Sequence, residues 1–129
     1  MPSQAEHLRK ARQNRVFFEA CEQNEEIKIS AKHCEWSIIV RFYECLHIVE
    51  AIAATKEIHF PKHEVRNAQI RMWKTLFDSE FANRYVDLYN LSWRARYSEK
   101  KIMHGDVADC DAAYTYIRNF AHTKHGLTI

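Results

Sequence analysis

Glycine and proline are nearly absent from this chain, whose 129 residues include only two of each. Sandwiches and barrels of β-strands need many tight turns, and doubly wound α/β folds need glycine-rich turns, so this scarcity argues against all three. A chain of this length forms one domain and can bury a sufficient core without disulfide or metal staples. We therefore expect a single all-α domain over residues 1–129, with a loose C-terminal tail at about 123–129.

Long apolar stretches are missing as well. The run Ile38-Ile39-Val40 ends at Arg41, and no run approaches the ~20 apolar residues that cross a membrane. The N-terminal segment lacks the apolar core of a signal peptide. The formal charge of +2 is too balanced for a histone-like binder, although it allows a local basic patch. We expect a soluble, cytoplasmic protein that does not bind membranes.

Cysteine pairs and metal-ligand patterns are absent from the sequence. The four cysteines include no CxxC pair, so we expect buried, reduced thiols. His47, His59 and His63 could supply three imidazoles to zinc, but Pro61 separates the last two, and no carboxylate or thiolate pair accompanies them. The sequence thus predicts neither a metal site nor a cofactor.

What the chain does have is the three- and four-residue spacing of amphipathic helices. The first predicted helix begins at Ser3, which can form a capping box with Glu6, and runs to about Cys21. The second begins after Ser30, and its wide apolar stripe predicts a central helix. The apolar positions of this stripe are Ala31, Cys34, Ile38, Ile39, Phe42, Cys45, Leu46, Val49, Ile52 and Ala53.

Three further helices follow a break at 55–62 that is marked by Pro61. The third, at about 63–77, has the predicted inward residues Val65, Ala68, Met72 and Leu76. Asp78 and Ser79 are caps for the fourth, whose stripe contains Phe81, Tyr85, Leu88, Ser92 and Ala95. After a polar loop at 98–105, Asp106 caps the fifth, whose stripe contains Val107, Cys110, Tyr114, Ile117 and Ala121. Short connectors between long helices predict an antiparallel up-and-down bundle of four to five helices.

Polar and aromatic residues recur along the middle three helices. They are Trp36, Phe42-Tyr43, His47 and Val49-Glu50-Ala51 on the second, His63 and Arg66-Asn67 on the third, and Tyr85, Leu88, Ser92 and Arg96-Tyr97 on the fourth. This pattern resembles the HEPN superfamily of small helical bundles, and it looks closest to the stand-alone, mostly uncharacterised members.

The resemblance implies a bundle that forms a homodimer. It also implies either a metal-independent endoribonuclease of a toxin–antitoxin or defence system, or a partner of a nucleotidyltransferase. Ribonuclease members carry an arginine, often followed by a polar residue, and a histidine after a gap of four to six residues. In this chain Arg66-Asn67 is followed by Arg71 where the histidine would stand, and seven residues separate Arg96 from His104.

Two groups of residues are candidates for phosphate recognition. His63 and Arg66 lie three apart at a predicted helix start, where free backbone N–H groups favour an anion, and Asn67 adds a neutral donor. The alternative is a solvated helix start in which Arg66 pairs with Glu64 or another nearby carboxylate. His47 is either a hydrogen-bonded core residue or a proton-transfer group in the same cleft as His63.

The second group is the densest basic stretch of the chain. Its basic residues are Arg94, Arg96, Lys100, Lys101 and His104, interleaved with the aromatic residues Trp93 and Tyr97. Basic side chains would contact phosphates, and an aromatic face could stack a base. The alternative is a solvated helix end whose positive charges complement the helix dipole.

Three functions remain open at this point. In the first, the chain binds RNA or a nucleotide; in cleavage the ribose 2′-OH would attack phosphorus, with His104 or His63 moving the proton and Arg96 or Arg66 stabilising the charge. In the second, it is a non-catalytic module that pairs with itself, a nucleotidyltransferase or an antitoxin, and the imperfect ribonuclease spacing favours this. In the third, it binds a small molecule in the interior of the bundle. We expect Arg66 and Arg96 to reach one cleft, lined by His47 or His63.

Overall fold

A computed structural model of the protein describes residues 2–129, which contain helices and no strand. The helices, in chain order, are α1 (Gln4–Gln23), α2 (Ile29–Lys32), α3 (Cys34–Ala54), α4 (His63–Met72), α5 (Ser79–Tyr97) and α6 (His104–His125). This confirms the predicted all-α bundle. No helix of the described residues is both long enough and apolar enough to cross a membrane.

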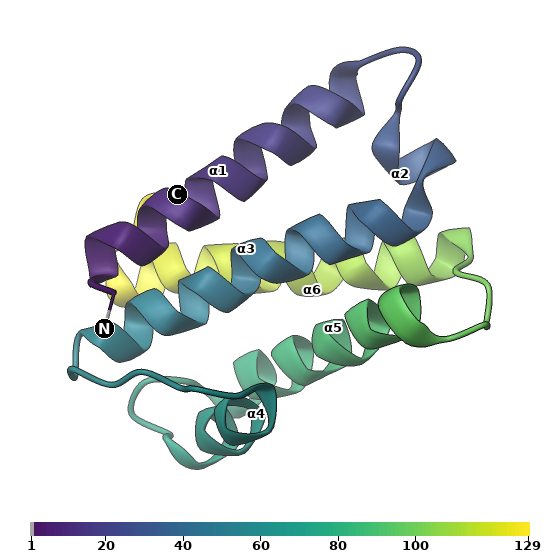
Figure 1. The fold of residues 1–129 in the computed structure, drawn as a ribbon. Helices are drawn as coiled ribbons and strands as arrows, with labels where there is room; N and C mark the ends of the chain where they lie inside the picture. The colour runs from purple at the N-terminus through teal and green to yellow at the C-terminus, as the bar shows by residue number, and fades with distance from the viewer. Residues whose placement is uncertain (1) are drawn as a thin grey trace.

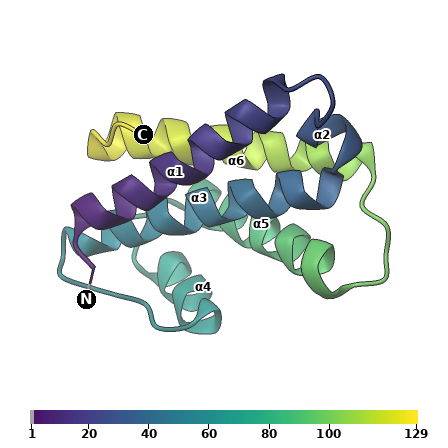
Figure 2. The same ribbon diagram turned by 45° about the horizontal axis from the view of Figure 1, so that its top comes forward.

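The long helix α3 lies at the centre of the bundle (Figures 1 and 2). The first helix, α1, crosses one side of it, whereas α5 and α6 cover another side and also contact each other. Along the chain α1, α3, α5 and α6 alternate in direction, so that consecutive long helices are antiparallel (Figure 1). The short α4 packs against α5 near the C-terminal end of α3.

The central place of α3 follows from its wide apolar stripe. Ile38, Phe42, Cys45, Val49 and Ile52 have no exposed surface. Since neighbouring helices cover α3 on several sides, residues beyond a single stripe are buried as well, including some charged ones. The fold therefore has to satisfy ionisable groups in its own core.

Two predicted helix starts are confirmed in detail. The backbone N–H of Glu6 donates to Ser3 Oγ at 3.2 Å, and the Ser3 N–H donates to the Glu6 carboxylate at 3.3 Å, which completes the capping box. At the start of α5, Asp78 Oδ1 accepts from the backbone N–H of Phe81 at 2.6 Å. These caps satisfy backbone donors that have no partner within their helices.

The third helix, α4, is shorter than predicted, and it buries a different face. It ends at Met72 rather than near 77, and Val65, Ala68 and Met72 are exposed rather than inward. The buried residues of α4 are Arg66 and Ile70 instead. The reason is that Arg66 turns inward to reach a buried carboxylate of α3, which rotates the predicted apolar face towards solvent. Leu76 is buried as predicted, although it lies in the turn that follows the helix.

Two other helix starts differ from the prediction. The second predicted helix is divided, because the single turn α2 ends at Lys32 and the non-helical residue His33 separates it from α3. The fifth begins at His104, ahead of its predicted cap Asp106. Asp106 lies inside the first turn and accepts a 2.9 Å hydrogen bond from the backbone N–H of Met103, so its carboxylate still serves the helix start.

The C-terminal tail begins as helix. The last helix continues to His125 and ends at Gly126, whose φ of 65° is the left-handed conformation that glycine adopts readily. Leu127 is buried in the core. Arg12 donates to the carbonyl of Thr128 at 2.7 Å, so the tail contacts α1.

A buried acid of α3 contacts α6. Glu44 has no exposed surface, and it accepts a 2.7 Å hydrogen bond from the hydroxyl of Tyr114. The guanidinium of Arg118 lies 3.4 Å from the carboxylate. Burial raises the pKa of Glu44 to about 7, against the smaller opposing effects of Tyr114 and Arg118. The folded protein therefore holds the Glu44 proton more tightly than the unfolded chain does.

We expect the Glu44→Gln change to remove a pH dependence of stability. Because the pKa of Glu44 is raised on folding, the parent loses stability as pH rises from about 4.5 to about 7. The free energy of unfolding of the Gln variant, measured relative to that of the parent, should therefore rise by roughly 3 kcal/mol across that window. Urea unfolding at several pH values measures this, and the exposed Glu99→Gln variant should follow the parent. A constant difference between Glu44→Gln and the parent at every pH would contradict the prediction.

Candidate functional site

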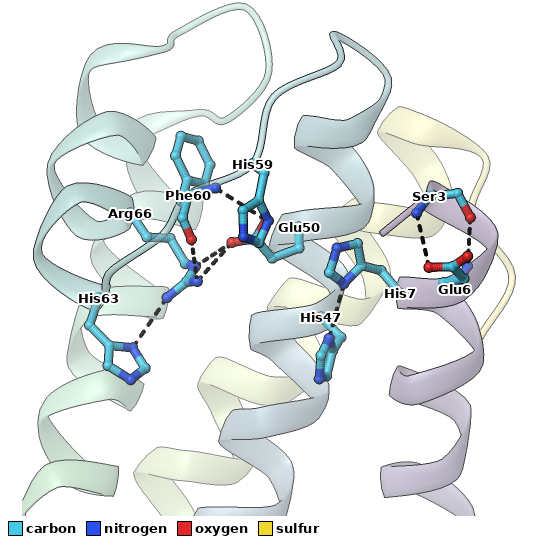
Figure 3. Close-up of polar contacts among 9 residues, drawn as sticks. All are labelled: Ser3, Glu6, His7, His47, Glu50, His59, Phe60, His63 and Arg66. Atoms are coloured by element: carbon cyan, nitrogen blue, oxygen red, sulfur yellow. Dashed lines mark hydrogen bonds and ion pairs between the residues drawn. The ribbon is translucent and has the colours of Figure 1, made fainter. Parts of the chain in front are cut away.

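Polar side chains converge where the C-terminal half of α3 meets the connector 55–62 and the start of α4 (Figure 3). Glu50 is 1% exposed, and its Oε1 accepts a 2.8 Å hydrogen bond from Nε of Arg66. A second nitrogen of Arg66, Nη2, donates to the carbonyl of Phe60 at 3.0 Å. The backbone N–H of Phe60 and the ring of His59 face the other oxygen of Glu50. The Arg66 guanidinium thus donates its hydrogen bonds to groups of the fold itself.

The partner of Arg66 is therefore Glu50, which lies 16 residues earlier, and not the neighbouring Glu64. The sequence did carry a signal for this pair. Glu50 stands in the apolar surroundings of Val49 and Ala51, where a carboxylate requires a partner to be buried. The choice of partner, however, depends on how the connector folds back over α3.

His63 lies on the far side of Arg66 from Glu50. Its Nδ1 is 3.2 Å from Nη1 of Arg66. A guanidinium has only donors, so Nδ1 accepts this bond and the proton of the neutral ring is on Nε2. Burial lowers the pKa of His63, and the charges of Arg66 and Arg96 lower it further. His63 is therefore held as a neutral hydrogen-bond donor between two arginines.

Arg96 reaches the same region from the C-terminal end of α5. Its guanidinium donates to the hydroxyl of Tyr43 at 3.0 Å and to the carbonyl of Ser92 at 3.2 Å. It lies 5.8 Å from the ring centre of Phe42, and the ring of His63 is 5.9 Å from that same ring. Within residues 2–129, no carboxylate pairs with Arg96.

These contacts define what we name the Arg96 site. It consists of Arg96, His63, Tyr43, Tyr89 and Tyr97. The ring of Tyr89 lies 5.3 Å from that of His63, and the guanidinium of Arg96 lies 5.1 Å from the ring of Tyr97. Neither Tyr43 nor Tyr89 is among the candidate site residues predicted from the sequence. The site combines positive charge, a neutral N–H donor and aromatic rings, which suits an anion attached to a planar ring.

The basic stretch beyond this site divides into exposed and paired residues. Tyr97 is 65% and Trp93 is 47% exposed, and their ring centres are 5.7 Å apart. Lys100 and Lys101 are exposed in the loop that follows. Arg94, by contrast, points its guanidinium at the carboxylate of Asp106 at 3.4 Å.

Two candidates form no hydrogen bond with Arg96 among the described residues. His104 is exposed at the start of α6 and lines a hollow with Lys32, Glu35 and Lys101. Among the described residues, no hydrogen bond or ring contact joins it to Arg96. Asn67 is half-buried on α4, and its Oδ1 has no hydrogen-bond partner within residues 2–129.

His47 faces a different group of residues from His63. Its Nδ1 lies 3.1 Å from Nδ1 of His7, a residue of α1 that is not among the candidates predicted from the sequence (Figure 3). Burial lowers the pKa of His47 to about 4, and the proximity of His7 contributes. His63, rather than His47, therefore lies between Arg66 and Arg96. Nothing in the sequence pairs His7 with His47, since the two are 40 residues apart on different helices.

No family model, no curated protein and no solved structure matches this chain. The relation to the HEPN superfamily accordingly stays a prediction from the residue pattern.

Replacing Arg66 by Ala should destabilise the fold. The change leaves the buried Glu50 carboxylate without its guanidinium, and breaking a buried pair in this way costs about 3–5 kcal/mol. Urea unfolding measures the effect as a fall in the free energy of unfolding. The double variant Arg66→Met with Glu50→Gln should recover much of the loss, because no uncompensated charge remains.

Arg84 provides the matched control for this prediction. It forms a 3.0 Å ion pair with Glu80 on the surface of α5, with both side chains well exposed. Such pairs contribute about 0–1 kcal/mol, so Arg84→Ala should change stability little. Equal losses in the Arg66→Ala and Arg84→Ala proteins would show that the Glu50–Arg66 pair does not stabilise the fold.

Proposed function

We propose that this chain is a HEPN-like protein that binds single-stranded RNA, with a phosphate held at the Arg96 site. The observation that carries the proposal is the placement of Arg96. Its guanidinium is half-buried, anchored by Tyr43, and without a carboxylate partner in residues 2–129. An arginine that is positioned but not neutralised favours an anionic ligand.

The remaining donors of the site suit a phosphate. Arg96 uses Nε for Ser92 and one Nη1 hydrogen for Tyr43, so part of its five-donor fork stays available. The Nε2–H of His63 adds a neutral donor close by. A phosphate bound here would meet two kinds of donor from two different helices, α4 and α5.

Aromatic residues next to Arg96 support RNA as the ligand rather than a free anion. Tyr97 and Trp93 present large exposed rings, and the cation of Arg96 lies over Tyr97. Stacking on such rings tolerates any base and contributes about 1–3 kcal/mol per base. Lys100 and Lys101 would extend the contact to neighbouring phosphates.

The geometry favours binding over cleavage. A general base needs a free lone pair, but the only lone pair of neutral His63 accepts from Arg66. The other proton carrier that the sequence suggests, His104, has no contact with Arg96 in the described residues. The ribonuclease, toxin–antitoxin and nucleotidyltransferase-partner roles stay predictions from the family resemblance.

The Arg96→Ala protein should bind single-stranded RNA more weakly than the parent. Loss of a charge-assisted hydrogen bond predicts a drop of about 10- to 100-fold in affinity. Parent affinity should fall steeply with salt, and the variant should show a shallower salt dependence because one phosphate contact is gone. A gel shift with a labelled homopolymeric oligonucleotide measures both effects.

Arg84→Ala removes the same charge from the start of α5 and should leave affinity nearly unchanged. The melting temperature of the Arg96→Ala protein should also stay within a few degrees of the parent. Failure of the parent to shift RNA at low salt would exclude the proposal. Shortened RNA after incubation with the parent alone, and not with Arg96→Ala, would instead establish cleavage at this site.

An apolar hollow favours the alternative function, that of a dimeric interaction module. Phe17 is 56%, Ile27 is 38% and Trp36 is 62% exposed. These three side chains line one hollow of about 350 Å³ between α1 and the start of α3, together with Cys21 and Ile29. Exposed apolar residues that gather in this way are typical of a protein contact. We propose a second copy of this chain as the partner.

Sedimentation at micromolar concentrations should then give a homodimer. Trp36→Glu places a charge in the contact and should give a monomer, while far-UV circular dichroism stays helical. Trp93→Glu, a matched change at the other exposed tryptophan, should remain a dimer. A monomeric parent would remove the dimer from the proposal without affecting the Arg96 site.

A further inference from the structure

Three histidines and a glutamate converge from three segments of the chain (Figure 3). His7 comes from the first turns of α1, His47 and Glu50 from successive turns of α3, and His59 from the connector that follows. Neither His7 nor His59 belongs to the Arg96 site. Their arrangement indicates a separate site.

The distances between donor atoms suit one small cation. Single ligand atoms of His7, Glu50 and His59 all lie within 4.8 Å of one another. One of these pairs, His59 Nδ1 and Glu50 Oε2, is 3.2 Å apart. A tetrahedral zinc ion with bonds of about 2.0–2.2 Å holds its ligand atoms about 3.3–3.6 Å apart. Small movements of the side chains would therefore bring all three ligands to bonding distance.

Burial gives the cluster one closed side and one open side. His7 is 4% and Glu50 is 1% exposed, whereas the side chain of His59 is 39% exposed. A cation could enter past His59 and reach two ligands that the fold holds in place.

The histidines of α1 and α3 are joined to each other. Nδ1 of His7 and Nδ1 of His47 lie 3.1 Å apart, so one of these nitrogens donates and the other accepts. When the neutral Nδ1 of His47 accepts from the Nδ1–H of His7, the lone pair of His7 is on Nε2. Histidines that bind metals commonly donate their second N–H to a fixed acceptor in this way.

We propose that His7, Glu50 and His59 bind one divalent transition-metal ion, with His47 as the residue that positions His7. Two imidazoles and one carboxylate form a ligand set that suits zinc, with a fourth position open. Glu50 keeps its Oε1 on Arg66 and offers Oε2 to the ion. The ion would tie the start of α1 to α3 and to the connector. This site goes beyond RNA binding and does not depend on it.

Titration of chelator-treated, tag-free protein with Co²⁺ and Zn²⁺ tests the proposal. We expect one equivalent of Co²⁺ to give the visible absorption of a four-coordinate site, displacement of the Co²⁺ by Zn²⁺, and a higher melting temperature with Zn²⁺. His59→Ala should lose the absorption and the thermal shift. Because His59 is on an exposed connector, this variant should remain folded, and circular dichroism checks that it does.

His122→Ala, a change at an exposed histidine of α6, is the control for surface binding and should behave as the parent. A parent that binds no metal would show that the four residues form only a hydrogen-bonded cluster. Equal binding by the parent and His59→Ala would place the metal elsewhere. Either result overturns the proposal.

His47 requires a separate readout because it acts through His7. His47→Ala should weaken Zn²⁺ binding by about 10- to 100-fold while the stoichiometry stays at one. His47→Gln, whose amide oxygen can accept the same hydrogen bond, should restore most of the affinity. Unchanged Zn²⁺ affinity in the His47→Ala protein would remove His47 from the site.

Discussion

The buried pair of Glu50 and Arg66 is the interaction on which the arrangement of the polar residues depends. It joins the central helix α3 to the short helix α4 and holds the connector between them through the backbone of Phe60. A buried carboxylate is costly unless it is paired, so α4 has to turn Arg66 inward, even though this exposes Val65 and Met72. The same pair holds His63 on one side and His59 on the other.

This pair separates the two arginines that the sequence treats alike. Arg66 donates to groups within the fold and positions His63, whereas Arg96 remains available to a ligand beside exposed aromatic rings. The lowered pKa of His63 follows from this placement, since burial and two nearby cations both disfavour its protonation. A chain of hydrogen bonds runs from His63 through Arg66 and Glu50 to His59. The proposed RNA contact would thus lie at its His63 end and the proposed metal ion at its His59 end.

Much of the architecture could be predicted because it depends on local patterns. The apolar stripe of α3 and the caps at Ser3 and Asp78 each act within a few residues, and the structure bears them out. Predictions failed where a distant partner decided the outcome. The buried face of α4 was predicted from its apolar residues. In the structure, pairing the buried Glu50 carboxylate with Arg66 decides which face is buried instead. The start of α6 shifted because Asp106 can serve the helix from inside its first turn.

The sequence by itself determined an all-α bundle around α3, because helical periodicity is a property of neighbouring residues. It also pointed to His63, Arg66 and Arg96, among others, as candidate ligand-binding residues. Only the tertiary structure decided that Arg66 is structural, that Tyr43 anchors Arg96, and that His7 meets His47 and His59 beside Glu50. These contacts join residues far apart in the chain, and their partners are set by how helices cross and where a connector folds back, which no local spacing records.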